Sequence, residues 1–318
     1  MSEFPLVSVV TLTYNKFDNI YRTIDSVLNQ TYPKIELIIH DDCSKQFPYE
    51  EIFTYIKKNK KNNLINFLVH SNDRNVGTVK NINMAYKKTN GTYIFNLAGD
   101  DIFYKNTVID DIVKVFNKEN CGMLVTSRLG CDENLAPLRL YPYKSARKSI
   151  AKLNTNKKQY LALLTYEFYQ MASGSATYFK KSLLEEIGYF DENYILWEDY
   201  PIYLKYTWKK QIFFAYDIIS IYYVHGGVSN SKKVNPLMEQ DHETMKKLEW
   251  KRHYSELNKK EQNIVDYMIK KRNAANLLQR IGVLLKYPIV DFSHIFYKAK
   301  MEYFKKVDEH HHFQYVQK

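Results

Sequence analysis

The stretch Leu6–Thr13, LVSVVTLT, decides the fold class, because it is short, apolar and rich in β-branched residues. Such a run predicts a strand that is buried on both faces, as in a parallel sheet. The apolar residues that follow share one face of a helix: Ile20, Ile24, Val27 and Leu28. Strands then alternate with helices through residue 127. This alternation predicts βαβ units and an α/β fold with a mainly parallel central sheet.

The other elements expected in this part are strands at 35–40, 64–70, 92–98 and 122–126, and helices at 50–58, 79–86 and 108–116. Beyond it we expect a helix near 159–168, strands at 176–179 and 213–224, a helix opened by Glu198 and Asp199, and helix from 238 to about 286. The sequence therefore predicts an α/β domain over residues 1–235 and a helical C-terminal extension over residues 236–318.

Composition and charge limit the classes of protein. With 45% hydrophobic and 25% charged residues the chain is typical of a folded globular protein. Three cysteines without a CxxC spacing exclude a disulfide scaffold and a zinc ribbon. We expect neither a secretory signal nor a membrane span. The net charge is +11, and residues 241–318 carry 16 basic and 10 acidic groups, so this part suits an anionic surface or forms a solvated face.

Acidic pairs follow two of the expected strands. Asp41-Asp42 ends the second strand and Asp100-Asp101 follows the fourth, while Thr13 and Tyr14 end the first. In an open α/β sheet ligands bind at the carboxyl ends of the strands, where these residues meet. Neighbouring carboxylates repel unless a cation or a donor compensates them. A divalent cation holding a phosphorylated ligand is one interpretation, and a turn or helix cap is the other.

Several common phosphate and hydrolase motifs do not occur in the chain. The sequence contains no GxxxxGK[ST] loop, no GxGxxG, no HExxH and no GxSxG. These absences leave a nucleotide diphosphate held through a metal ion rather than through a glycine-rich loop.

Six motifs in order resemble the family 2 glycosyltransferases of the GT-A fold, over roughly residues 5–230. They are SVVTLTYN at 8–15, NQTYPKIELIIHDDCS at 29–44, NVGTVKNINMA at 75–85, GTYIFNLAGDD at 91–101, IGYFDE at 187–192 and WED at 197–199. The resemblance implies a metal-assisted transfer, with Mn2+ or Mg2+, of a sugar from a nucleotide-sugar to an acceptor hydroxyl. It also implies a single displacement with inversion, so that an α-linked donor gives a β-linked product.

The resemblance also implies roles for individual residues. The donor nucleotide, taken as UDP, is expected to contact a set drawn from the strand ends and the loops after them: Leu12, Thr13, Tyr14, Asp41, Asp42, Gly77 and Asp100. Asp42 accepts from the uracil with Asp41 in support. The metal is expected at Asp100, Asp101 and His225. Asp199 is expected to act as the catalytic base, with Glu198 beside it.

Other positions keep two interpretations. Trp197 either stacks on an acceptor sugar or is simply buried, and Ser173 with Gly174 either faces donor and acceptor or forms a tight turn. Where the family often has Asp two residues before Asp100 this chain has Ala98, so either Asp100 or Asp101 is the direct metal ligand. Tyr223 replaces a frequent basic residue, which leaves Lys80 or Lys232 to neutralise the diphosphate.

The expected partners are a UDP-sugar and a glycan or lipid-linked saccharide, as in bacterial enzymes that build capsule or lipopolysaccharide. The basic C-terminal part predicts peripheral contact with the anionic inner face of the plasma membrane or a homo-oligomer interface. We expect a cytoplasmic protein that does not bind nucleic acid. Two alternatives remain at this point: a metal-dependent sugar nucleotidyltransferase, and a non-enzymatic protein that binds polyanions or lipid.

Overall fold

The computed structural model describes residues 4–132, 134–165, 171–224 and 235–311. Its strands are β1 (Val7–Thr13), β2 (Ile35–Asp41), β3 (Leu64–Ser71), β4 (Tyr93–Asn96), β5 (Ile102–Phe103), β6 (Met123–Cys131), β7 (Pro137–Tyr141), β8 (Thr177–Lys180) and β9 (Phe213–Val224). They form one sheet in the order β3-β2-β1-β4-β8-β6-β9-β5, and β7 pairs with β6. The α/β fold with a mainly parallel sheet is therefore confirmed.

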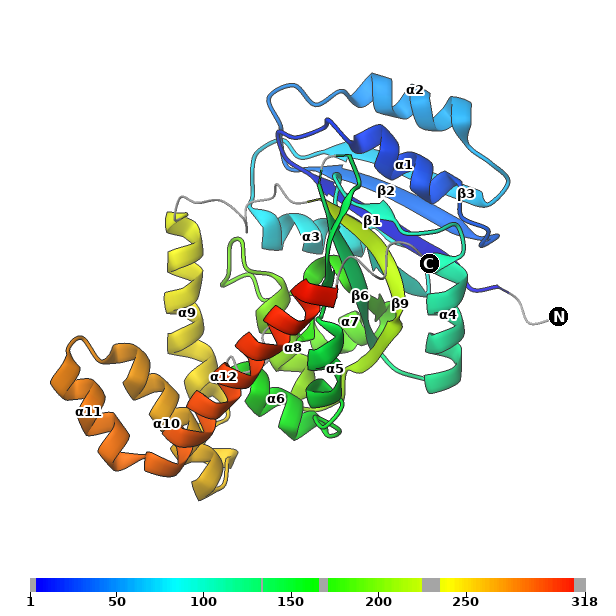
Figure 1. Ribbon diagram of the computed structural model, residues 1–318. Helices are drawn as coiled ribbons and strands as arrows, with labels where there is room; N and C mark the ends of the chain where they lie inside the picture. Colours follow the sequence, from blue (N-terminus) through cyan, green and yellow to red (C-terminus); the bar gives the residue numbers. More distant parts are fainter. Residues whose placement is uncertain (1–3, 133, 166–170, 225–234, 312–318) are drawn as a thin grey trace.

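The N-terminal half of the sheet follows the expected pattern closely. The strands β3, β2, β1 and β4 are parallel neighbours, and every residue of β2 is buried. Helices cover this half: α1 (Ile20–Leu28), α2 (Tyr49–Asn59), α3 (Thr78–Lys87) and α4 (Val108–Glu119). Figure 1 shows α1 and α2 on one face and α3 on the other. All parallel strands here end at one edge, which brings the expected acidic pairs together.

The second half of the sheet is mixed, which differs in detail from the expected alternation. The strand β8 lies between β4 and β6 and is antiparallel to both, so β6 keeps the direction of β4 although the two are not neighbours. The short strands β5 and β7 are also antiparallel to their partners. Neither β7 nor the helices α5 (Lys144–Ile150) and α7 (Lys181–Ile187) were predicted, because short segments carry too little periodicity.

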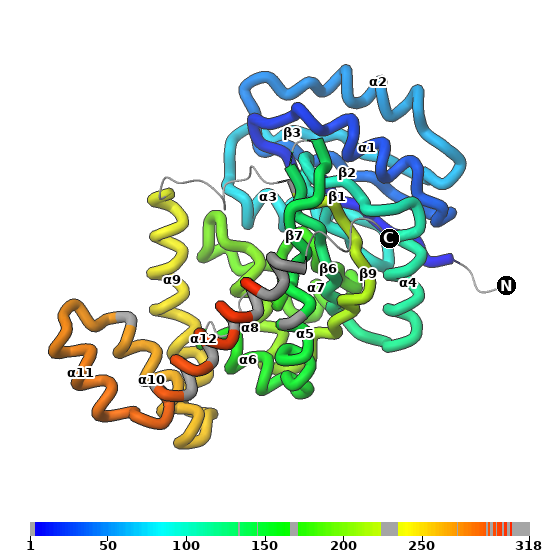
Figure 2. Tube along the Cα trace, in the orientation of Figure 1, coloured from blue at the N-terminus to red at the C-terminus, as the bar shows by residue number. Residues whose placement is uncertain are grey.

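The remaining helices are α6 (Asn156–Leu164), α8 (Asp199–Thr207), α9 (Pro236–Arg252), α10 (Lys259–Asn273), α11 (Leu277–Lys286) and α12 (Pro288–His311). The C-terminal part is helical as expected, but it is broken at 253–258 and at 274–276. Asn258 and Asn276 cap the helices that restart there, each accepting from a backbone N–H three residues later. Both views show α10 and α11 farthest from the sheet, with α12 returning toward α5 (Figures 1 and 2).

The helices after residue 235 share a core with the α/β part. Met245 and Trp250 of α9, and Val265 of α10, belong to the same buried cluster as Val79 of α3 and Leu204 of α8. The division at residue 235 stays a prediction, and α9 packs as part of the body that precedes it. No helix among the described residues is both long and apolar enough to cross a bilayer.

Candidate active site

Asp41 is a buried structural acid at the end of β2. Its carboxylate accepts from the Thr13 hydroxyl at 3.0 Å, the Ser71 hydroxyl at 2.7 Å and the Ser44 backbone N–H at 2.7 Å. These donors come from the ends of β1 and β3 and from the turn after β2. Asp41 therefore ties three strand ends together, and its support of Asp42 in nucleotide binding stays a prediction.

Asp42 is buried as well, and it holds the start of α3. Its carboxylate accepts from the backbone N–H groups of Val76 and Gly77, both at 2.9 Å, and from the Asn72 side chain at 2.9 Å. Gly77 has φ +85°, a left-handed conformation that an L side chain rarely adopts. The glycine is thus required by the local turn that presents its N–H to Asp42.

Tyr14 projects from the loop after β1 and is 53% exposed. The next residue, Asn15, has φ +51° and is fixed by bonds between its backbone N–H and the Ser44 hydroxyl, and between its side chain and the Lys45 N–H. The aromatic ring beside the Asp41–Asp42 turn is therefore accessible on a fixed loop. Thr13 is buried, and Leu12 packs against the core.

The second acidic pair divides into an outer and an inner residue. Asp100 is partly exposed and pairs with Lys16 at 2.8 Å, whereas Asp101 is buried and its carbonyl accepts from the Thr23 hydroxyl at 2.8 Å. Among the described residues no group of three or more His, Cys, Asp or Glu side chains is arranged to hold a metal ion. His225 and Lys232 lie outside the described residues, and Lys80 is exposed on α3.

The third acidic pair, Glu198-Asp199, opens α8 as expected. The carboxylate of Asp199 accepts from its neighbour's backbone, the Tyr200 N–H, at 2.7 Å, and from the Gly174 N–H at 3.3 Å. A Cβ placed on Gly174 would lie 3.2 Å from Glu198 Oε1 and 3.4 Å from Asp199 Cβ. The structure therefore packs the Ser173–Gly174 segment directly against this pair, and only a glycine fits there without displacement.

Burial decides the charge of the Glu198–Asp199 pair. It raises the pKa of Glu198, and the nearby charge of Asp199 raises it further. Burial raises the pKa of Asp199 too, while the Gly174 and Tyr200 N–H groups and the Arg128 guanidinium oppose that rise. Since the stabilising donors favour ionised Asp199, Glu198 is the member that keeps a proton more readily. The pair thus offers one carboxylate beside one neutral carboxyl.

Glu198 also borders a small cavity inside the protein. The cavity measures about 10 Å³, close to the room that a single water needs, and Tyr86, Asn96, Gly174, Asp199 and Tyr203 are among the residues that line it. Asn96 ends β4, four residues before Asp100. The late acidic pair therefore lies next to the strand that leads into the Asp100–Asp101 turn.

Arg128 is a site residue that the sequence did not single out. It lies in β6 and donates to the Ser175 hydroxyl at 2.8 Å. Its guanidinium lies over the rings of Tyr141 and Tyr223. Its positive charge stabilises the ionised form of Asp199. An isolated arginine on a strand gives no signal in one sequence, because the contact depends on β6 and β9 being adjacent.

Asp241 of α9 is the second residue that the sequence did not reveal. Its buried carboxylate accepts from three consecutive backbone N–H groups: Ile195 at 2.8 Å, Leu196 at 2.7 Å and Trp197 at 2.9 Å. Trp197 itself stacks on Tyr200, with ring centroids 4.9 Å apart. A helix beyond residue 235 therefore holds the segment that leads into Glu198 and Asp199.

Two contacts join the early and the late acidic pairs. The Ile195 carbonyl accepts from the Val79 N–H at 3.0 Å, and a Cβ placed on Gly77 would lie 3.0 Å from the Ile195 side chain. The start of α3 thus binds Asp42 on one side and the Ile195–Trp197 segment on the other. The turn at Gly77 and the segment that leads into Glu198 and Asp199 are therefore in contact.

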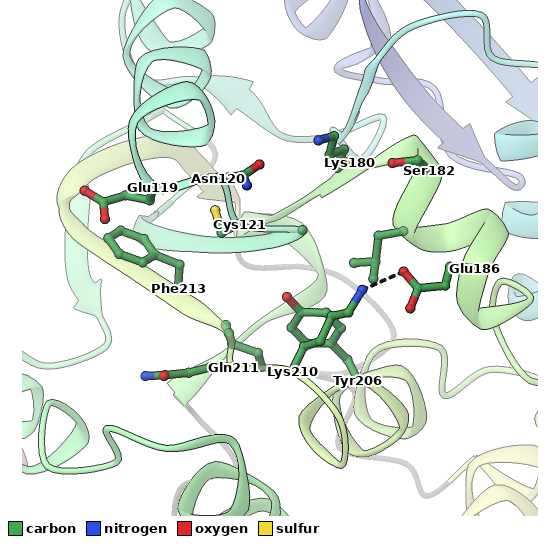
Figure 3. Close-up of a pocket in the computed structure, with 13 residues that line it drawn as sticks. Glu119, Asn120, Cys121, Lys180, Ser182, Glu186, Tyr206, Lys210, Gln211 and Phe213 are labelled. Atoms are coloured by element: carbon green, nitrogen blue, oxygen red, sulfur yellow. Dashed lines mark hydrogen bonds and ion pairs between the residues drawn. The ribbon is translucent and has the colours of Figure 1, made fainter.

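A larger pocket opens elsewhere, at the amino ends of β6 and β9 (Figure 3). Its volume is about 670 Å³, and its lining includes Cys121, Lys180, Tyr206 and an ion pair between Lys210 and Glu186 at 2.5 Å. None of the expected site residues lines it. Because ligands of open α/β sheets bind at the carboxyl ends, chemistry rather than size identifies the active site here.

The comparisons with known proteins agree with this arrangement. The model of the family described as "Glycosyl transferase family 2" matches residues 8–188, more than half of the chain. The chain therefore belongs to glycosyl transferase family 2, and it is a glycosyltransferase enzyme. The family match thus confirms the resemblance seen in the six motifs.

Two relatives indicate the bacterial character of the family branch. An uncharacterized glycosyltransferase of Rickettsia typhi is 25% identical over 238 residues, which cover 74% of this chain and 70% of that protein. The UDP-Glc:alpha-D-GlcNAc-diphosphoundecaprenol beta-1,3-glucosyltransferase WfaP of Escherichia coli is 35% identical over 107 residues, which cover 34% of this chain and 40% of that protein. Both relatives are bacterial proteins named as glycosyltransferases, in agreement with the family match.

Solved structures confirm the GT-A fold with a helical C-terminal part. The TarS 1–349 fragment of S. aureus in complex with UDP-GlcNAc has a TM-score of 0.61 at 18% identity, covering 97% of this chain and 92% of that one. The mannosyltransferase PcManGT of Pyrobaculum calidifontis, in complex with GDP-Man and Mn2+, has a TM-score of 0.52 at 15% identity, covering 97% and 88%. At these identities the likeness concerns the fold alone.

Proposed function

We propose that this enzyme transfers a sugar from a UDP-sugar to a hydroxyl of a glycan or lipid-linked saccharide, with inversion at the anomeric carbon. The observation that carries the proposal is Asp199, a half-buried carboxylate at the start of α8 that is held by the Gly174 and Tyr200 N–H groups. A base in this state has a raised pKa and a fixed direction, as a proton acceptor near neutral pH needs.

The reaction follows from the charges at each end of the site. The acceptor oxygen attacks the anomeric carbon on the face opposite the diphosphate, and its proton passes to a carboxylate oxygen of Asp199. The bond between the anomeric carbon and the diphosphate oxygen breaks, and its electron pair leaves with UDP. Glu198, being the more readily protonated member of the pair, leaves Asp199 as the base.

The donor nucleotide is assigned to the strand ends. Tyr14 offers an exposed ring to the uracil, and Asp42 Oδ2 accepts one described bond, from Gly77, although a carboxylate oxygen accepts two. Asp41 supports this turn and accepts from the Thr13 hydroxyl, while Leu12 packs against the core beneath. The UDP-GlcNAc complex of the S. aureus TarS fragment supports a UDP-sugar as the first donor class to test.

A divalent cation fits the Asp100–Asp101 turn. Mg2+ and Mn2+ are bound through one or two carboxylates together with substrate phosphates, so the partly exposed Asp100 suits the role of ligand and the buried Asp101 the role of support. When bound, the ion supplies positive charge to the departing diphosphate. Lys16, paired with Asp100, lies at the same place. The Mn2+ of the mannosyltransferase complex supports testing this ion first.

The acceptor is assigned to the Ser173–Gly174 segment and Trp197, which flank Asp199. The name of the E. coli relative WfaP gives a diphosphoundecaprenol-linked acceptor and a β-1,3 linkage, which supports a lipid-linked saccharide and an inverted product. Family membership favours this function over the nucleotidyltransferase and polyanion-binding alternatives.

A thermal-shift panel with UDP, GDP, CMP and dTDP, each with and without Mn2+, tests the donor class. A ligand at about 100 Kd adds about 2.7 kcal/mol to the free energy of unfolding, so the matching nucleotide gives a clear rise in Tm. We expect the rise with UDP, larger with Mn2+. A UDP-sugar screen with the anomeric configuration of the product read by NMR then follows. A shift with GDP alone, or an α-linked product from an α-linked donor, would overturn the proposal.

A further inference from the structure

An exposed apolar surface on α11 and the first turns of α12 has no function in the catalytic site. Seven large apolar side chains, each 41–84% exposed, form it: Leu277, Leu278, Ile281, Leu285, Ile289, Phe292 and Phe296. We refer to them as the α11–α12 face. The two helices are joined by Tyr287 alone, and both views place α11 at the end of the molecule farthest from the sheet.

The face is not left over from packing against the body. On α11 the side chain that packs inward is Val283, which contacts the small cluster of Tyr267, Met268 and Tyr287. Leu277, Leu278, Ile281 and Leu285 have the spacing of a single helical face and remain exposed. Soluble proteins rarely expose contiguous apolar surface of this kind unless it binds a partner.

Charge around the face selects the partner. Between residues 270 and 300 the sequence has seven basic residues and one acidic residue, Asp291; the basic ones are Lys270, Lys271, Arg272, Arg280, Lys286, Lys298 and Lys300. The side chains of Lys270, Arg280 and Lys286 are exposed. An apolar helical face bordered by cations matches a bilayer that has acyl chains inside and anionic headgroups at its surface.

The same charges disfavour two other occupants. In a symmetric dimer built on this face the basic residues of one copy would oppose those of the other, with Asp291 as the one acid of residues 277–296 in each copy to pair them. A polynucleotide would supply phosphates but nothing to bury the leucine and phenylalanine side chains. We propose that the α11–α12 face docks the enzyme on the surface of an anionic lipid bilayer.

Docking would bring the enzyme to the surface that carries a lipid-linked acceptor. The helices α10 and α9 connect the face to the body, and α9 carries Asp241, which holds the segment before Asp199. The inference rests on the proposed function only in that a lipid-linked saccharide would be presented at the same bilayer. Membrane binding itself requires neither the donor nor the reaction.

Flotation of the full chain with vesicles tests the proposal. We expect binding to phosphatidylcholine vesicles that contain about 30 mol% phosphatidylglycerol, and little binding to vesicles of phosphatidylcholine alone. The variant Leu278→Ser/Leu285→Ser/Phe292→Ser is expected to lose binding by about 100-fold or more. The variant Arg280→Gln/Lys286→Gln is expected to lose roughly 30-fold, and only on anionic vesicles. Ile65→Ser, which removes an exposed apolar side chain from β3, is the matched control and leaves flotation unchanged.

Two further measurements separate the possible failures. Without vesicles, the triple variant should show the same UDP-induced rise in Tm and the same transfer to a soluble saccharide as the parent. A failure of the proposed donor is thereby distinguished from a failure of membrane docking. Light scattering of the parent and the triple variant reports self-association. Equal flotation of the triple variant and the parent, or a dimer that the triple variant converts to monomer without any change in flotation, would overturn membrane docking.

Discussion

Two pairs of adjacent acidic residues, Asp41-Asp42 and Glu198-Asp199, differ in the number of hydrogen-bond donors that surround them. The carboxylates of the first pair accept seven hydrogen bonds from donors within the described residues, four at Asp41 and three at Asp42. The Asp199 carboxylate accepts two hydrogen bonds, and one of them is long at 3.3 Å. Burial is the largest influence on the pKa values of Glu198 and Asp199. The Asp41–Asp42 pair is surrounded by hydrogen-bond donors, whereas the Glu198–Asp199 pair is held where negative charge is costly.

The difference separates a framework from a reactive group. Donors directed at a carboxylate from several elements tie those elements together, so Asp41 and Asp42 serve as anchors for β1, β3 and α3. Burial with few donors keeps a carboxylate basic, which suits proton transfer. Substitution of the first pair should therefore cost stability, and substitution of Asp199 should cost activity.

The largest effect is expected for Asp199→Asn. The transfer rate should fall by about 10²–10⁴-fold, because the amide cannot take the acceptor proton. The free energy of unfolding should stay within about 1 kcal/mol of the parent, since a carboxylate that is penalised by burial is replaced by a neutral group of the same size. Initial rates and chemical denaturation measure the two quantities.

Glu198→Gln is the matched control for this substitution. Glu198 holds a proton more readily than Asp199, so a neutral amide resembles its resting state and the rate should fall by less than about tenfold. A near-normal rate in Asp199→Asn, or a larger loss in Glu198→Gln than in Asp199→Asn, would show that the base is misassigned.

Asp42→Ala should show the opposite profile in denaturation. The backbone N–H groups of Val76 and Gly77 lose their acceptor inside the protein, at a cost of about 1–3 kcal/mol per buried group, so a total near 3 kcal/mol is expected. Asp100→Ala is the comparison variant, because its partly exposed ion pair with Lys16 contributes about 1 kcal/mol or less. Equal losses in the two variants would contradict the role of Asp42 as an anchor.

The N-terminal half of the fold was predictable because its signals are local. Each strand from β1 to β4 is an apolar run, and each helix beside it has one apolar face, so strand ends and their acids could be placed from sequence alone. The strand β8 was located within one residue, but its position between β4 and β6 was not predicted. Insertion of an antiparallel strand depends on long-range pairing, which no local periodicity records.

The site was predictable to the same extent. The motifs place the acidic pairs, Tyr14 and Gly77, and the structure joins them through the contact between Gly77 and Ile195. Arg128 and Asp241 were missed, because each meets the Glu198–Asp199 region only after β6, β9 and α9 have packed. A single arginine on a strand, or aspartate on a polar helix, has no distinguishing sequence pattern.

Asp241→Asn tests how far the late acidic pair depends on α9. The amide has one accepting oxygen in place of two, so at least one of the three N–H groups of Ile195, Leu196 and Trp197 loses its partner. We expect kcat to fall by about tenfold with little change in the donor KM, as for a positioning residue. Glu239→Gln, an exposed acid of the same helix, is the control and should have no effect; a change in KM alone would contradict positioning.

The smallest effect expected is a shift in the pH profile of kcat in Arg128→Met. Burial raises the pKa of Asp199 and the Arg128 charge lowers it, so removing that charge moves the pKa further up. Because Asp199 must be deprotonated to accept a proton, activity falls as the pH drops through this pKa, and the acid limb should move to higher pH. Arg128→Lys keeps the charge and should move it less. An unchanged limb in Arg128→Met would mean that the donors from Gly174 and Tyr200, which the substitution leaves in place, set the basicity of Asp199 by themselves.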